Sequence, residues 1–140
     1  MRNCEYLIKK LNLIPHPEGG HFAESYRDIN GNVSLIYYLL KNGEISHWHK
    51  LTKDEILHFY DGDPLIVSFS KNKINIQKII LGRDIKQGER LHHTIKSKTW
   101  FSMHSKGQWS LIGCTVAPAF NYKDLEIAPP TWKPINHKKK

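Results

Sequence analysis

The sequence has few cysteines, no long apolar run and no glycine-rich phosphate loop. Its two cysteines, Cys4 and Cys114, lie far apart and form no CxxC pair, which excludes a cysteine-based metal site and predicts two free thiols. The longest apolar run, residues 35–40, is much shorter than the ~20 residues needed to cross a bilayer. No GxSxG or HExxH motif is present either. These absences argue against a membrane protein, a disulfide scaffold and the common hydrolase and zinc-protease sites.

No apolar segment followed by small residues opens the chain, so the sequence predicts a cytoplasmic location rather than export. Acidic residues are fewer than basic ones, and the formal net charge is +8. Lysines 133 and 138–140 supply half of this charge, which leaves +4 for residues 1–132. Basic residues in that main part alternate with acids, whereas a nucleic-acid site would gather them with aromatic residues on one face. We therefore predict no nucleic-acid partner.

The 140 residues are enough for one domain, which we place at 1–132, followed by a basic tail at 133–140. Apolar residues at helical spacing behind Asn3 predict one short helix over residues 4–12. From residue 33 onward, short β-type runs alternate with turns rich in Gly, Asn, Asp and Pro. The predicted strands are 33–40, 45–51, 55–60, 65–70, 74–81, 93–103 and 108–116. This pattern indicates an all-β sandwich or barrel.

Nine histidines are present, and the clearest constellation among them is His47-Trp48-His49 followed by Glu55. On a regular strand His47 and His49 project from the same face, where two imidazoles can approach one ligand or metal ion. Five residues separate His49 from Glu55, so a turn can bring that carboxylate to the same opening. We predict His49 and Glu55 as a catalytic acid–base pair, titrating as a coupled unit, with His47 beside them. A metal-free polar cavity and a metal site on His47, His49 and Glu55 both remain open at this point.

Gly43, His47, His49, Glu55 and Gly62 together resemble the first signature of the cupin superfamily. The segments Pro15-His16-Pro17-Glu18-Gly19-Gly20 and residues 48–65 and 113–120 are similar to a subfamily of small single-domain cupins. Its members carry this HPEGG motif near the N-terminus and have no assigned function. The resemblance spans residues 7–126 and implies a double-stranded β-helix, or jelly-roll, barrel that forms a homodimer.

The second cupin signature is incomplete in this chain. The position of the usual third metal-binding histidine falls on Phe101, which cannot ligate a metal. Three protein ligands are usual at catalytic zinc or iron sites, so this loss favours chemistry without a required cofactor, with a divalent metal as the alternative. The resemblance also places a hydrogen-bonding side chain at His92. The further predicted pocket residues are Tyr38, Trp100 and Phe101.

Three functions follow as hypotheses. The first is an isomerase or epimerase that acts on a sugar or nucleotide-sugar derivative by His/Glu proton transfer. The second is a small-molecule binding protein without catalysis. The third is a metal-dependent cupin enzyme. The sugar assignment depends on analogy with metal-free cupin epimerases.

Overall fold

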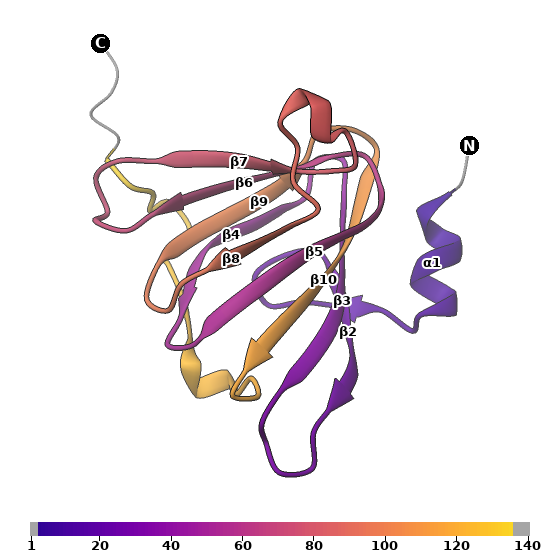
Figure 1. Ribbon diagram of the computed structural model, residues 1–140, viewed down its shortest axis with the longest axis horizontal. Helices are drawn as coiled ribbons and strands as arrows, with labels where there is room; N and C mark the ends of the chain where they lie inside the picture. Colours follow the sequence, from indigo (N-terminus) through magenta and orange to yellow (C-terminus); the bar gives the residue numbers. More distant parts are fainter. Residues whose placement is uncertain (1–2, 136–140) are drawn as a thin grey trace.

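Two antiparallel β-sheets packed face to face, with one short helix outside them, make up the computed structural model, which describes residues 3–135 (Figure 1). The first sheet has the order β1 (Ile14–Pro15), β2 (His21–Arg27), β3 (Ser34–Lys41), β10 (Trp109–Ala117), β5 (Asp54–Gly62) and β8 (His92–Ile95). The second sheet has the order β11 (Leu125–Ile127), β4 (Ile45–Leu51), β9 (Trp100–Ser105), β6 (Leu65–Ser70) and β7 (Gln77–Leu81). Two short 3-10 turns, Ile85–Gln87 and Tyr122–Asp124, complete the elements. This arrangement confirms the predicted all-β jelly-roll fold with a short N-terminal helix.

The main core lies between the two sheets. Alternation along each strand sends every second side chain inward, so Leu57 and Phe59 of β5 are buried while His58 between them is not. Val67 of β6, Phe101 of β9 and Ile112 of β10 fill the same space and are almost fully buried. The sheets are thus joined by close-packed apolar side chains.

The helix α1 (Cys4–Lys10) closes a second, smaller core on the outside of the first sheet. Asn3 accepts a hydrogen bond from the Glu5 backbone N–H at 2.9 Å, as expected of an N-cap. The helix ends two residues earlier than predicted, because Asn12 adopts a left-handed conformation with φ of 56°. Cys4 and Leu13 pack there against Leu39, Trp109 and Leu111.

Several strand boundaries differ from the predicted ones. Residues 93–103 form two strands rather than one, since Lys98 turns the chain with φ of 65° and sends β8 and β9 into different sheets. The strand predicted at 74–81 begins only at Gln77. Strands β2 and β11 were not predicted. Strand β2 is mostly polar and exposed, whereas β11 has three residues and pairs with β4, which is distant in the sequence.

The C-terminal segment packs along the second sheet. The Trp132 ring lies 4.8 Å from that of Trp100, Pro134 is buried, and the Ile135 N–H donates to the Lys73 carbonyl at 3.1 Å. Residues 133–135 of the predicted tail are therefore in contact with the barrel, and residues 136–140 lie outside the described range. Within residues 3–135, no helix is both long and apolar enough to span a membrane.

Candidate functional site

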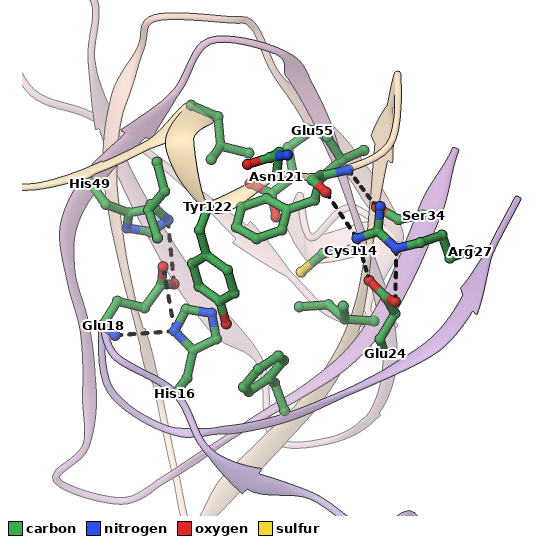
Figure 2. Close-up of a pocket in the computed structure, with 16 residues that line it drawn as sticks. His16, Glu18, Glu24, Arg27, Ser34, His49, Glu55, Cys114, Asn121 and Tyr122 are labelled. Carbon is green, nitrogen blue, oxygen red and sulfur yellow. Dashed lines mark hydrogen bonds and ion pairs between the residues drawn. The ribbon is translucent and has the colours of Figure 1, made fainter. Parts of the chain in front are cut away.

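A pocket of about 520 Å³ opens between the two sheets. This volume suits a small organic molecule. Its titratable lining comes from six places in the chain: the β1–β2 loop, β2, β4, β5, β10 and the 3-10 turn Tyr122–Asp124. The polar and titratable side chains in the lining are His16, Glu18, Glu24, Arg27, Ser34, His49, Glu55, Cys114, Asn121 and Tyr122 (Figure 2). Apolar residues, among them Phe22, Ile36 and Leu51, form the remainder of the wall.

His49 and Glu18 form a buried pair at one side of the pocket. His49 Nδ1 lies 2.7 Å from the His47 carbonyl oxygen, and because that oxygen only accepts, Nδ1 carries a proton. His49 Nε2 lies 3.3 Å from Glu18 Oε2, and the two side chains are 3% and 8% exposed. His49 Nε2 therefore faces the Glu18 carboxylate, and the two groups form a buried pair that can donate and accept a proton. Ser46 Oγ also donates to Glu18 Oε2 at 2.6 Å, which fixes the carboxylate.

The loop that carries Glu18 is held by several contacts. The Glu18 N–H donates to His16 Nδ1 at 3.1 Å, and the Glu18 carbonyl accepts from the His47 N–H at 2.9 Å. The Tyr38 hydroxyl donates to the Gly19 carbonyl. His16 packs edge-on against Phe22, and burial is the main cause that lowers its pKa. His16 is thus neutral near pH 7, with Nδ1 accepting and Nε2 carrying the proton.

Glu55 begins β5 and is 8% exposed. Burial, followed by the nearby charge of Glu18, raises the pKa of Glu55 to about 8, so it is a neutral carboxylic acid at pH 7. It also has a hydrogen bond with the thiol of Cys114, whose pKa burial raises well above its ordinary value. The pocket therefore holds a neutral acid in addition to the Glu18–His49 pair.

Figure 2 shows Glu24 and Arg27 on the side of the pocket opposite His16, Glu18 and His49. The Arg27 guanidinium contacts both Glu24 carboxylate oxygens, at 3.0 and 2.8 Å, and donates to the Phe120 carbonyl at 2.9 Å. Because the side chains of Arg27 and Glu24 are 44% and 37% exposed, this pair lies at the mouth. It ties β2 to the segment that follows β10.

The expectation that His47 shares a face with His49 is wrong. The pairing of β4 with β9 shifts register between Ser46 and His49, so the strand is bulged there. Ser46 and His49 consequently face inward, and both are buried. His47 turns away, and its Nε2 lies 2.9 Å from the Pro129 carbonyl.

Four other predicted ligand residues lie outside the pocket lining. Phe101 belongs to the core, with its ring 4.1 Å from that of His49, and Tyr38 is buried beneath the Glu18 loop. Trp100 packs against Trp132 on the outside of the second sheet. His92 is paired with His58 on the outer face of the first sheet, because the inward positions of β8 are His93 and Ile95.

The metal site expected on His47, His49 and Glu55 does not assemble. His47 is directed to Pro129, and the Nε2 atom of His49 faces Glu18. Across the described part of the chain, no three His, Cys, Asp or Glu side chains are arranged to hold a metal ion. These donors therefore do not fit the three-ligand metal site that the sequence left open.

Glu18, His16 and Ser46 are the pocket-side residues that sequence reasoning missed. The available signal was the presence of one histidine and one glutamate between the two prolines and the paired glycines. The contact with His49 spans 31 positions, from residue 18 to residue 49, and no local pattern reports it.

The fold and pocket together define a small β-barrel protein with a polar, partly buried pocket. Residues 5–128 match the family described as Cupin superfamily (DUF985). The chain therefore belongs to the cupin superfamily, and within it to a group of small proteins without an assigned function.

Two solved structures resemble this one over most of the chain. A protein from Shewanella oneidensis is 35% identical, with a TM-score of 0.86, covering 91% of this chain and 85% of that one. A hypothetical protein from Leishmania major is 29% identical, with a TM-score of 0.82, covering 91% and 88%. Oxalate decarboxylase from Bacillus subtilis is 15% identical with a TM-score of 0.66, and this chain covers 29% of its length. That last likeness shows the fold alone. A search of curated proteins finds none that matches.

Proposed function

We propose that this protein binds a small polar molecule in the barrel pocket and moves a proton on it, as an isomerase or epimerase does. The observation that carries the proposal is the buried Glu18–His49 pair, at 3.3 Å, in a pocket that also contains the neutral acid Glu55. An acid and a base held in different protonation states in one site are the usual requirement for such chemistry.

In the proposed step, the Glu18–His49 pair accepts a proton from a carbon next to a carbonyl group. The Glu55 carboxyl donates a hydrogen bond, or its proton, to the carbonyl oxygen, which stabilises the enol that forms. Return of a proton to the neighbouring carbon or to the other face completes an isomerisation or an epimerisation. No oxidant or reductant is consumed.

The ligand class follows from the pocket wall. Polar groups lie at opposite sides and apolar side chains between them, which suits a compact hydroxycarbonyl compound such as a sugar or nucleotide-sugar derivative. We expect the protein to act in the cytoplasm, where such compounds are metabolised.

The test is solvent-deuterium incorporation, followed by NMR, over a panel of sugars, sugar acids and nucleotide sugars. We expect exchange at the carbon next to the carbonyl for at least one compound. Glu18→Gln, His49→Ala and Glu55→Gln should each lower the exchange rate about 10²–10⁴-fold while the circular dichroism spectrum is unchanged. Glu126→Gln and His104→Ala, at exposed positions away from the pocket, are the matched controls and should exchange normally.

The same panel distinguishes the other two functions. Thermal stabilisation by a compound that shows no exchange would identify a binding protein and contradict catalysis. Exchange that disappears after dialysis against a chelator, and returns with Mn²⁺ or Zn²⁺, would contradict the proposed chemistry and favour a metal-dependent enzyme.

A further inference from the structure

A second cleft, of about 500 Å³, lies at the seam where the two sheets end. Strand β8 is the last strand of the first sheet and β7 the last strand of the second, and both lie away from α1 in Figure 1. The cleft shares no lining residue with the pocket that contains His49. It is therefore a separate candidate site.

The charged side chains that line this cleft are all basic. Lys71, Lys78, Arg90 and Lys96 surround it, and no Asp or Glu is among the described residues that line it. These residues are spread over 26 positions of the sequence, from 71 to 96, and the seam brings them together. Basic residues that alternate with acids along the sequence are thus gathered at one place by the fold.

Among the described residues, three of the four cations have no carboxylate in an ion pair with them. Within residues 3–135, ion pairs include none with Lys71, Lys78 or Arg90. Lys96 is paired with Asp54 at 3.5 Å, in an exposed contact. Like charges around a concave surface raise the local concentration of anions, so this cleft favours a ligand with several negative charges.

The floor and walls of the cleft offer apolar, aromatic and hydroxyl groups that a ligand could contact. Phe69 and Ile95 are buried beneath it, and the His93 ring lies 5.4 Å from that of Phe69. Arg90 donates from Nη1 to His93 Nδ1 at 3.0 Å, so the neutral His93 ring carries its proton on Nε2. Thr94 and Thr99 contribute hydroxyl groups. An anion bound here would rest its uncharged part on an apolar and aromatic surface.

We propose that this cleft binds a phosphorylated small molecule. Its phosphoryl group would contact Lys78, Arg90 and Lys71, and its organic part would pack on Phe69 and Ile79. Phosphate is favoured because cationic donors form short, charge-assisted hydrogen bonds with its oxygens. A small molecule is favoured over a nucleic acid because the charge is gathered around one cleft rather than spread along an open face.

The experiment is a titration of the full-length protein at constant ionic strength, followed by amide NMR and calorimetry. The probes are ADP, glucose 6-phosphate and pyrophosphate, with adenosine and glucose as their uncharged counterparts. We expect saturable binding of a phosphorylated probe, with shifts at Phe69, His93 and Thr94, and none of adenosine or glucose. Lys78→Gln/Arg90→Gln should weaken that binding by about tenfold or more, and Lys78→Arg/Arg90→Lys should largely retain it.

Lys9→Gln/Lys10→Gln removes the same charge from α1 and serves as the matched control, which should bind within about twofold of the unaltered protein. Equal weakening in both double variants would show a general charge effect and overturn the site. Binding of a single-stranded oligonucleotide without binding of any small probe would also overturn it. Normal binding by Lys78→Gln/Arg90→Gln would overturn the site as well. If that variant also aggregates, the role of Lys78 is to block pairing of the edge strand with another chain.

Discussion

At the scale of single residues, the pocket depends on two carboxyl groups in different surroundings. Glu18 is fixed at its Oε2 atom, which accepts a hydrogen bond from Ser46 Oγ and lies 3.3 Å from His49 Nε2. For Glu55, burial together with the charge of Glu18 raises the pKa to about 8. The carboxylate that sequence reasoning paired with His49 is therefore the proton-holding acid of the site, and the His49 partner is Glu18.

Glu55 makes the stability of the fold depend on pH. The native state keeps the Glu55 proton up to about pH 8, whereas the unfolded chain releases it near its ordinary value of 4.5. The native state thus binds more protons in this window, and the free energy of unfolding falls as pH rises from about 4.5 to 8. Gln at this position is neutral at every pH. We expect the stability of Glu55→Gln relative to the unaltered protein to rise across this window by roughly a few kcal/mol.

Urea unfolding at a series of pH values between 5 and 8 measures this difference. Glu126→Gln is the matched control, because Glu126 is 64% exposed and its removal should give a difference that does not change with pH. Parallel stability curves for Glu55→Gln and the unaltered protein would show that the Glu55 carboxyl is ionised in the native state.

At the scale of elements, the bulge in β4 decides which side chains enter the pocket. The sequence identifies the strand over residues 45–51 correctly, and regular alternation would place His47 and His49 on one face. The extra residue of the bulge replaces His47 by Ser46 as the inward neighbour of His49. A bulge arises from pairing with β9, which is distant in the sequence, so periodicity within β4 could not predict it.

The loop between β1 and β2 is the second element that builds the pocket, and Gly19 sets its shape. Gly19 has φ of 114°, and a Cβ placed there would lie 2.1 Å from the Ile45 carbonyl oxygen. Gly19→Ala must therefore move the loop away from β4 and separate Glu18 from His49. We expect loss of the pocket activity or binding and a fall in stability of about 1–3 kcal/mol.

Gly31 provides the matched control. Its φ of 74° is also left-handed, but a Cβ there meets nothing within 4 Å. Gly31→Ala should cost about 1 kcal/mol through backbone conformation alone and leave the pocket intact. Urea unfolding of both variants measures the loss of stability, and solvent-deuterium incorporation measures the activity of the pocket. Together they separate the effect of the clash at Gly19 from the conformational cost that both substitutions share. Equal effects of the two substitutions would contradict a positioning role for Gly19.

At the scale of the whole molecule, the sequence predicted the fold class and most strands, because alternation and turn residues are local signals. It did not predict how the strands divide between two sheets. That division depends on pairings such as Leu51 with Leu125, which connect β4 to β11. The same reason explains which pocket residues could be predicted. His49 and Glu55 were predicted from their local spacing, whereas Glu18 and Arg27 line the pocket because of contacts across the barrel.

The homodimer implied by the cupin resemblance remains a prediction. Sedimentation equilibrium over a wide range of protein concentrations should give twice the 16.3 kDa mass of one chain. A monomer at all concentrations would contradict it.

The two cysteines report on how stability is distributed through the molecule, since each lies in a different core. Cys114 is in β10, with β3 and β5 paired on either side of it. Cys4 begins the seven-residue helix α1 and is covered only by the small outer core. Both thiols are buried, and burial raises the pKa of each. Reaction with a thiol reagent therefore requires the chain to open.

We expect Cys4 to react first, because detaching one terminal helix exposes less apolar surface than separating the central strand from both neighbours. Cys114 should react at the rate of global unfolding, and the ratio of the two rates should fall as denaturant is added. Maleimide labelling followed by peptide mass spectrometry measures each site separately, and the unfolded chain should label at both. Identical rates for the two thiols without denaturant would show that α1 opens only when the barrel unfolds.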